Sequence, residues 1–190
     1  METQGHVLES GLGKGLKLPH YTQQVVSLTE TDDQPGMYQL IPGRMFETSM
    51  SLHPCQVSTE NLPWPENSFD TVVCIFTLCS ILIIKRSIAK IFLVLKPRWL
   101  FLFLEHGLCE YPRQQQWMHR LNPFQQRLSV GCNLNGDISD DFLKQPIEPL
   151  NLKRFVLEKV SAILGSCLRG MLRKSEWKSF SPIHRPLRIL

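Results

Sequence analysis

The chain of 190 residues has no long hydrophobic run, no CxxC pair and no low-complexity tract. Its longest nearly apolar stretch, residues 72–84, contains Thr77 and Ser80 and is too short for a membrane-spanning helix. The six cysteines lack metal or disulfide spacing, so free thiols in a reducing compartment fit best. Five residues precede His6, which leaves no room for a signal peptide before the first predicted strand. We therefore expect a cytoplasmic protein.

The composition, with 43% apolar and 20% charged residues, is typical of a globular protein with a sizeable core. The charge is uneven. Residues 151–190 carry nine Lys and Arg against two Asp and Glu, whereas residues 1–150 carry twelve against fifteen. The basic residues near the end are spread among apolar ones, which favours a solvated face over binding to nucleic acid or anionic lipid. We expect one domain over residues 1–176 and a basic, flexible tail over residues 177–190.

Strand-like and helix-like patterns alternate along the chain, which predicts an α/β fold with a mostly parallel sheet. Five parallel strands and a closing antiparallel hairpin would give seven strands. The expected strands are residues 6–9, 25–28 (extending toward 31), 55–58, 71–76, 100–105, 155–160 and 171–174, and a helix is expected at 87–95. The pattern of residues 111–146 predicts a helical insertion on the substrate side of the domain. Its apolar residues between Trp117 and Leu128 would line a pocket for a hydrophobic acceptor or simply form core.

A glycine-rich segment follows the first predicted strand. Glu9 ends the strand, and Gly11, Gly13 and Gly15 follow at alternate positions. Glycines permit a positive φ and a close approach of the backbone to a ligand. A dinucleotide fingerprint would need its third glycine at Leu16, and the Lys-Ser or Lys-Thr pair of a phosphate loop is absent. Glu9 could accept from an ammonium group while the glycine amides face a carboxylate, although an ordinary glycine-rich turn is the alternative.

Four segments occur in a distinctive order: the loop at residues 9–15, Asp32, residues 59–73 and residues 94–107. Together they resemble the class I methyltransferases that use S-adenosylmethionine, within the small-molecule subgroup of the methyltransferase type 11 and thiol methyltransferase-like proteins. The resemblance implies a Rossmann-like fold, S-adenosylmethionine as cofactor and a small acceptor, lipophilic ones included. No nucleic-acid partner is expected, because the excess of basic over acidic residues is confined to residues 151–190 and no aromatic-proline catalytic tetrapeptide occurs.

The resemblance also implies roles for individual residues. It assigns Asp32 to the ribose hydroxyls, with Glu30 or Asp33 as alternatives if the strand register shifts. His106 follows the fifth predicted strand and is a candidate base, with a hydrogen-bonded loop histidine as an equal alternative. No set of His, Cys, Asp and Glu shows ligand spacing, so no metal site is expected. The predicted cofactor-binding residues are Glu9, Gly11, Gly13 and Gly15 at the methionine end, Asp32 at the ribose, Glu60 and Asn61 at the adenine side, and Thr77 at the pocket wall.

Some positions depart from the family pattern. Arg98-Trp99 stands where two glycines are usual, so we expect that turn to be remodelled. Pro42-Gly43 would break the helix expected between strands two and three, and Gly136 replaces a common basic residue. With only five residues before His6, we expect no counterpart of the helical segment that usually precedes the first strand. The leading hypothesis is therefore methyl transfer to a small acceptor, and the alternative is a degenerate, non-catalytic relative that acts as a binding or interaction module.

Overall fold

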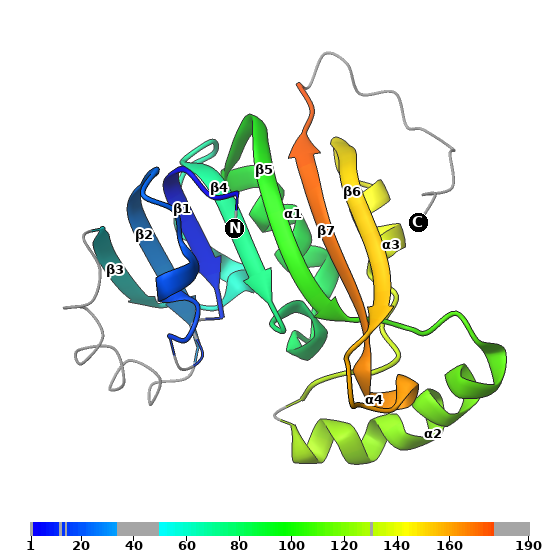
Figure 1. Cartoon of the computed structure of the whole chain (residues 1–190). Coiled ribbons are helices and arrows are strands. Elements are labelled where there is room, and N and C mark those ends of the chain that lie inside the picture. Colours follow the sequence, from blue (N-terminus) through cyan, green and yellow to red (C-terminus); the bar gives the residue numbers. More distant parts are fainter. Residues whose placement is uncertain (1, 12, 14, 34–49, 130, 177–190) are drawn as a thin grey trace.

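A seven-stranded sheet forms the centre of the molecule (Figure 1). The computed structural model describes the chain except residues 1, 12, 14, 34–49, 130 and 177–190. The strands are β1 (Gly5–Ser10), β2 (Val25–Asp32), β3 (Ser51–Gln56), β4 (Phe69–Ile75), β5 (Leu95–His106), β6 (Ile147–Val156) and β7 (Ser166–Lys174). The α-helices are α1 (Ile84–Val94), α2 (Pro112–Leu128), α3 (Ser139–Leu143) and α4 (Ala162–Gly165), and short 3-10 turns are η1 (Leu18–His20), η4 (Thr59–Asn61) and η5 (Leu78–Ser80).

The strand order is β3-β2-β1-β4-β5-β7-β6. The pairs from β3 to β5 are parallel, and β7 runs antiparallel to both β5 and β6. The predicted α/β fold with a closing antiparallel hairpin is confirmed. The chain leaves β1 toward β2 and β3 and returns on the other side as β4, so the carboxyl ends of β1 and β4 flank a topological switch point.

The main core lies between the sheet and the layer of α1 and α3 behind it (Figure 1). Ile88 and Ile91 of α1 are fully buried because their spacing places them on one helix face. On the opposite face of the sheet, Leu18 and Tyr21 pack against a smaller apolar cluster at β1 and β2. Most of β4 is buried, as expected for a central strand that is covered on both faces.

The two edge strands differ from the prediction. β3 begins at Ser51, before the expected residues 55–58, and β6 covers Ile147–Val156 instead of residues 155–160. Both strands are largely exposed and contain a proline, Pro54 or Pro149, which an edge strand tolerates because one side of its backbone has no partner strand. The hydrophobic pattern is therefore weak at both edges.

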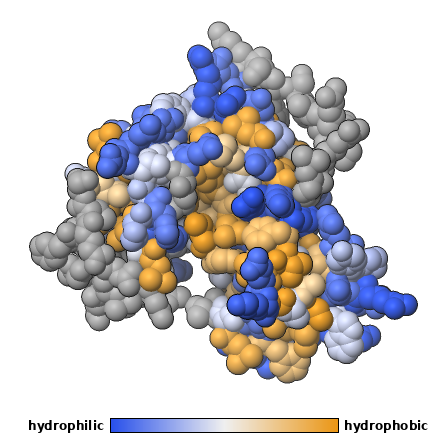
Figure 2. Space-filling view, in the orientation of Figure 1, coloured by the Kyte–Doolittle hydropathy of each residue, from blue (hydrophilic) through white to orange (hydrophobic). Residues whose placement is uncertain are grey.

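The predicted insertion at residues 111–146 contains helices, as expected, and α2 lies beyond the carboxyl ends of β4 and β5 (Figure 1). Met118 is buried against Leu134 on one side of α2. Apart from Met118, the apolar stripe of α2 is exposed instead of forming core, and Figure 2 shows apolar side chains gathered at this lower edge. The exposed members are Trp117, Leu121, Phe124 and Leu128.

The turn at Arg98 is built as an irregularity within β5. The pairing with β4 passes from Phe69 opposite Leu95 to Thr71 opposite Leu100, so β5 carries extra residues there. Arg98 has a φ of 68°, a left-handed conformation that glycine adopts without strain. The strand therefore continues with an L residue where the resemblance predicts glycine. Pro42-Gly43 and the tail at 177–190 lie outside the described residues. Within the described residues, no helix has the length and hydrophobicity of a membrane span.

Candidate active site at the carboxyl edge of the sheet

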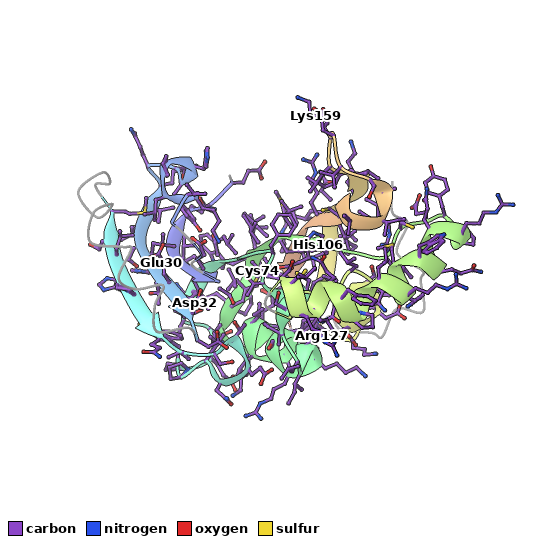
Figure 3. The ribbon with its side chains drawn as sticks, turned by 90° about the horizontal axis from the view of Figure 1, so that it is seen from below. Glu30, Asp32, Cys74, His106, Arg127 and Lys159 are labelled. Carbon is purple, nitrogen blue, oxygen red and sulfur yellow. The ribbon has the colours of Figure 1, made fainter. Side chains whose placement is uncertain are left out.

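The carboxyl ends of β1, β2, β4 and β5 bring most of the predicted site residues to one edge of the sheet. Figure 3 shows Glu30 and Asp32 on β2, and His106 farther along the sheet toward α2. Ligands of open α/β sheets bind at this edge, beside the switch point. The topology thus assembles residues that lie far apart in the sequence.

Glu9 is a buried carboxylate at the end of β1, with 1% of its surface exposed. Its Oε1 forms an ion pair with Lys17, and its Oε2 accepts a hydrogen bond of 2.6 Å from the Tyr21 hydroxyl. Lys17 Nζ also donates to the carbonyl of Gly11 at 2.6 Å. Burial raises the pKa of Glu9, while Lys17 and Tyr21 oppose that rise. Both oxygens are therefore engaged within the protein, which sequence reasoning did not anticipate.

Glu30 lies directly beside Glu9 in the parallel register of β1 and β2. It is fully buried, and neither of its carboxylate oxygens has a hydrogen-bond partner among the described residues. Burial and the nearby charge of Glu9 raise the pKa of Glu30 from 4.5 to about 8. Asp32, the residue predicted for the ribose, ends β2 and is half-buried. The register therefore places the alternative, Glu30, next to Glu9.

The three glycines of the loop share a positive φ, of 81° at Gly11, 56° at Gly13 and 66° at Gly15. A Cβ atom at Gly11 would overlap the Oγ1 atom of Thr77, which itself donates to the Ser10 carbonyl at 2.8 Å. Gly11 thus allows the loop to pack against the segment after β4. A Cβ atom at Gly13 would meet nothing within 4 Å, so this part of the loop faces open space.

Glu60 and Asn61 are turned toward the start of α1. Glu60 Oε1 accepts from the backbone N–H of Ile83 at 3.0 Å, which satisfies a donor at the helix N-terminus. Arg86 donates to the Asn61 side chain and to the Glu60 carbonyl. These side chains fix the 3-10 turn to α1, and their predicted place at the adenine side stays a prediction.

Glu105 organises the segment after β4, a role that sequence reasoning missed. It is fully buried, and its oxygens accept from the backbone N–H groups of Thr77 and Leu78 at 3.0 Å and of Cys79 at 3.1 Å. Burial raises the pKa of Glu105, and these donors oppose the rise. The sequence feature that could have revealed this role is a carboxylate at the end of an uninterrupted apolar strand.

His106 lies against two thiols and an aromatic ring. Its Nδ1 atom is 3.1 Å from Cys132 Sγ and 3.7 Å from Cys79 Sγ, and its ring centroid is 4.8 Å from that of Phe76. The hydrogen bond between the two sulfurs lowers the pKa of the Cys132 thiol and raises that of Cys79. The two cysteines were not assigned to the site, because they are separated by 53 positions and show no spacing signal.

A family model described as a methyltransferase domain matches residues 8–103, half of the chain. The chain belongs to this family. The matched range of the methyltransferase domain runs from β1 into β5 and includes the glycine loop, η4 and the segment held by Glu105. The predicted resemblance is thereby confirmed.

Among curated proteins, the domain is similar to the thiol S-methyltransferase TMT1B of Rattus norvegicus. The two are 26% identical over 153 residues, which cover 77% of this chain and 62% of the rat protein. The chain thus spans less than two thirds of the length of that relative.

Two solved structures illustrate the shared fold. The YcgJ protein of Bacillus subtilis has a TM-score of 0.71 and 15% identity, covering 91% of this chain and 93% of that one. The N-methyltransferase NodS of Bradyrhizobium japonicum, in complex with S-adenosyl-L-homocysteine, has a TM-score of 0.69 and 14% identity. The match covers 90% of this chain and 79% of NodS.

Proposed function

We propose that the domain binds S-adenosylmethionine at the carboxyl ends of β1 and β2 and transfers its methyl group to the thiol of a small acceptor. Membership of the methyltransferase family supports the reaction class, and the name of the rat relative supports the thiol. The observation that carries the proposal is the buried Glu9 carboxylate beside a glycine loop that faces open space at Gly13.

In this proposal Glu9 accepts from the ammonium group of the cofactor, after Lys17 has moved away from its Oε1 atom. The backbone of Gly11 and Gly13 faces the methionine carboxylate. Glu30 and Asp32 compete for the ribose hydroxyls, and Glu30 is favoured because neither of its oxygens has a hydrogen-bond partner among the described residues. A hydroxyl donor there would satisfy a buried acceptor that is otherwise costly to leave unpaired.

When bound, S-adenosylmethionine supplies a methyl group that an acceptor thiolate takes by in-line displacement. The protein's residues then contribute mainly alignment and exclusion of water. His106 is the candidate base for the thiol proton, because it lies at the same sheet edge beyond Glu105 and is only partly buried. Thr77, which packs on Gly11, forms the wall between the glycine loop and this acceptor side.

One observation favours a second candidate function, binding without methyl transfer. The Lys17 ammonium already occupies the Glu9 carboxylate, so a cofactor amine must displace an ion pair within the protein. Such competition weakens binding and would suit a domain that retains the cofactor only loosely.

Calorimetric titration with S-adenosylmethionine, followed by transfer of a labelled methyl group, tests both candidates. The acceptors are 2-mercaptoethanol, as a hydrophilic thiol, and 1-octanethiol, as a lipophilic one. We expect heat of binding and a labelled thioether. Glu9→Gln should weaken binding roughly 10- to 100-fold, as expected for a lost hydrogen bond to a charged group. The exposed Glu110→Gln serves as control.

The outcomes separate the candidates. Binding without labelled product from either thiol favours the non-catalytic candidate. Absence of heat at millimolar cofactor would refute both. Equal affinity of the Glu9→Gln and Glu110→Gln variants would refute the assigned role of Glu9.

A further inference from the structure

Three side chains with metal-ligating atoms meet beside η5. The sulfurs of Cys79 and Cys132 are 3.4 Å apart, and His106 Nδ1 lies 3.1 and 3.7 Å from Cys132 and Cys79. One ligand atom from each of these residues lies within 4.8 Å of the other two. The residues come from η5, the end of β5 and the loop after α2, so only the tertiary structure brings them together.

We propose that Cys79, His106 and Cys132 form a binding site for a thiophilic divalent metal ion, with Zn²⁺ as the first candidate. A tetrahedral zinc ion, with Zn–S near 2.3 Å and Zn–N near 2.0 Å, holds two sulfurs about 3.8 Å apart and a sulfur and a nitrogen about 3.5 Å apart. The observed separations depart from these values by about 0.5 Å or less. Small side-chain movements therefore suffice to place all three atoms around one ion.

The chemistry of the donors favours zinc over magnesium or calcium, because thiolate and imidazole ligands suit zinc and oxygen ligands suit the other two ions. Three protein ligands leave the fourth position to water or a small molecule, as in catalytic rather than structural zinc sites. Cys79 and Cys132 are buried at 5% and 6% exposure, whereas His106 is partly exposed. The ring therefore marks a path by which an ion reaches the sulfurs.

The backbone around the two cysteines is held by buried polar contacts. Asn133, next to Cys132, donates to the carbonyl of Cys79 from both its backbone N–H, at 2.8 Å, and its side-chain amide, at 3.0 Å. The Glu105 carboxylate accepts from the Cys79 N–H on the other side, at 3.1 Å. These contacts position both sulfurs before any ion binds. Supporting groups of this kind orient the ligands of protein metal sites.

The inference does not depend on the proposed function, since its test needs neither cofactor nor acceptor. A metal ion at this site would, however, change the role proposed for His106 as a base. A metal ion bound through Nδ1 fixes the ring proton on Nε2, so this histidine acts as a base only in the metal-free protein.

The test titrates the reduced, chelator-treated protein with Zn²⁺ in competition with a chromophoric chelator, and with Co²⁺ for its thiolate charge-transfer absorption. We expect one ion per chain, thiolate-to-cobalt absorption and a higher melting temperature with zinc. Cys132→Ser and His106→Gln should each weaken binding more than the roughly 10- to 100-fold that loss of a supporting residue costs. Cys109→Ser, another buried thiol outside the cluster, is the matched control and should bind as the wild type does.

Some results would overturn the proposal. Failure of the reduced wild-type protein to take up any zinc in the titration would refute the site. Equal loss of zinc affinity in Cys109→Ser and Cys132→Ser would refute it as well. A Cys79–Cys132 disulfide found by mass spectrometry in protein that takes up no zinc after reduction would assign the pair to redox chemistry instead. Should Cys79→Ser fail to fold, Cys132→Ser and His106→Gln decide the question, with circular dichroism to verify their fold.

Discussion

Replacing Glu30 by Gln should stabilise the domain, and more so as the pH rises. The folded protein holds Glu30 fully buried beside Glu9, and its pKa is raised from 4.5 to about 8. These values lie about 3.5 pH units apart, and each unit corresponds to about 1.4 kcal/mol, which sets a ceiling near 5 kcal/mol on the ionisation penalty. At pH 7 the same relation gives a destabilisation of about 3 kcal/mol from the Glu30 carboxyl group.

The sign follows from proton binding. Between pH 4.5 and about 8 the folded protein retains a proton on Glu30 that the unfolded chain has lost. The free energy of unfolding of the wild type therefore decreases as the pH rises through this range, relative to a chain without this carboxyl group. Glutamine has nearly the same shape and cannot ionise, so the Glu30→Gln variant avoids that loss.

Urea denaturation of wild type and Glu30→Gln at intervals between pH 5 and pH 9 measures the effect. The difference in the free energy of unfolding should grow with pH, by up to about 1.4 kcal/mol per unit, and level off above pH 8. Glu110→Gln, which removes an exposed carboxyl group, is the control for the substitution itself. A difference that is constant across this pH range would refute the reasoning, because a buried carboxyl group with a raised pKa must produce a slope.

Three further predictions concern backbone conformation and the contacts that hold the backbone in place. Arg98→Gly should raise the free energy of unfolding by about 1 kcal/mol in urea denaturation, because Arg98 has a φ of 68°; a decrease would contradict the strain argument. Gly11→Ala should lower the melting temperature, at a cost of about 2 kcal/mol or more, since its Cβ would overlap Thr77 Oγ1; an unchanged melting temperature would argue against this packing. Lys174→Met should cost about 1–3 kcal/mol and speed hydrogen exchange at the end of α1, because Lys174 Nζ donates to the Leu95 carbonyl at 2.6 Å; unaltered exchange would count against it.

Local patterns determined the fold class and the family. The buried β4, the strand that ends in Glu105 and the glycine loop after Glu9 are continuous segments, so short-range hydrophobic patterning and glycine spacing reveal them directly. The prediction misplaced the edge strands β3 and β6 because they are largely exposed and interrupted by proline, and their pairing partners rather than their own pattern define them.

The details of the site depended on the tertiary structure. Parallel register alone places Glu30, rather than Asp32, beside Glu9 and leaves it without a hydrogen-bond partner among the described residues. Likewise, spacing in the sequence could not join Cys79, His106 and Cys132, because their proximity arises where η5, β5 and the loop after α2 converge. The sequence by itself determined which ligand-binding fold this chain forms. Only the packing of strands and loops decided which charges and thiols meet at its carboxyl edge, because such contacts join residues that are distant along the chain.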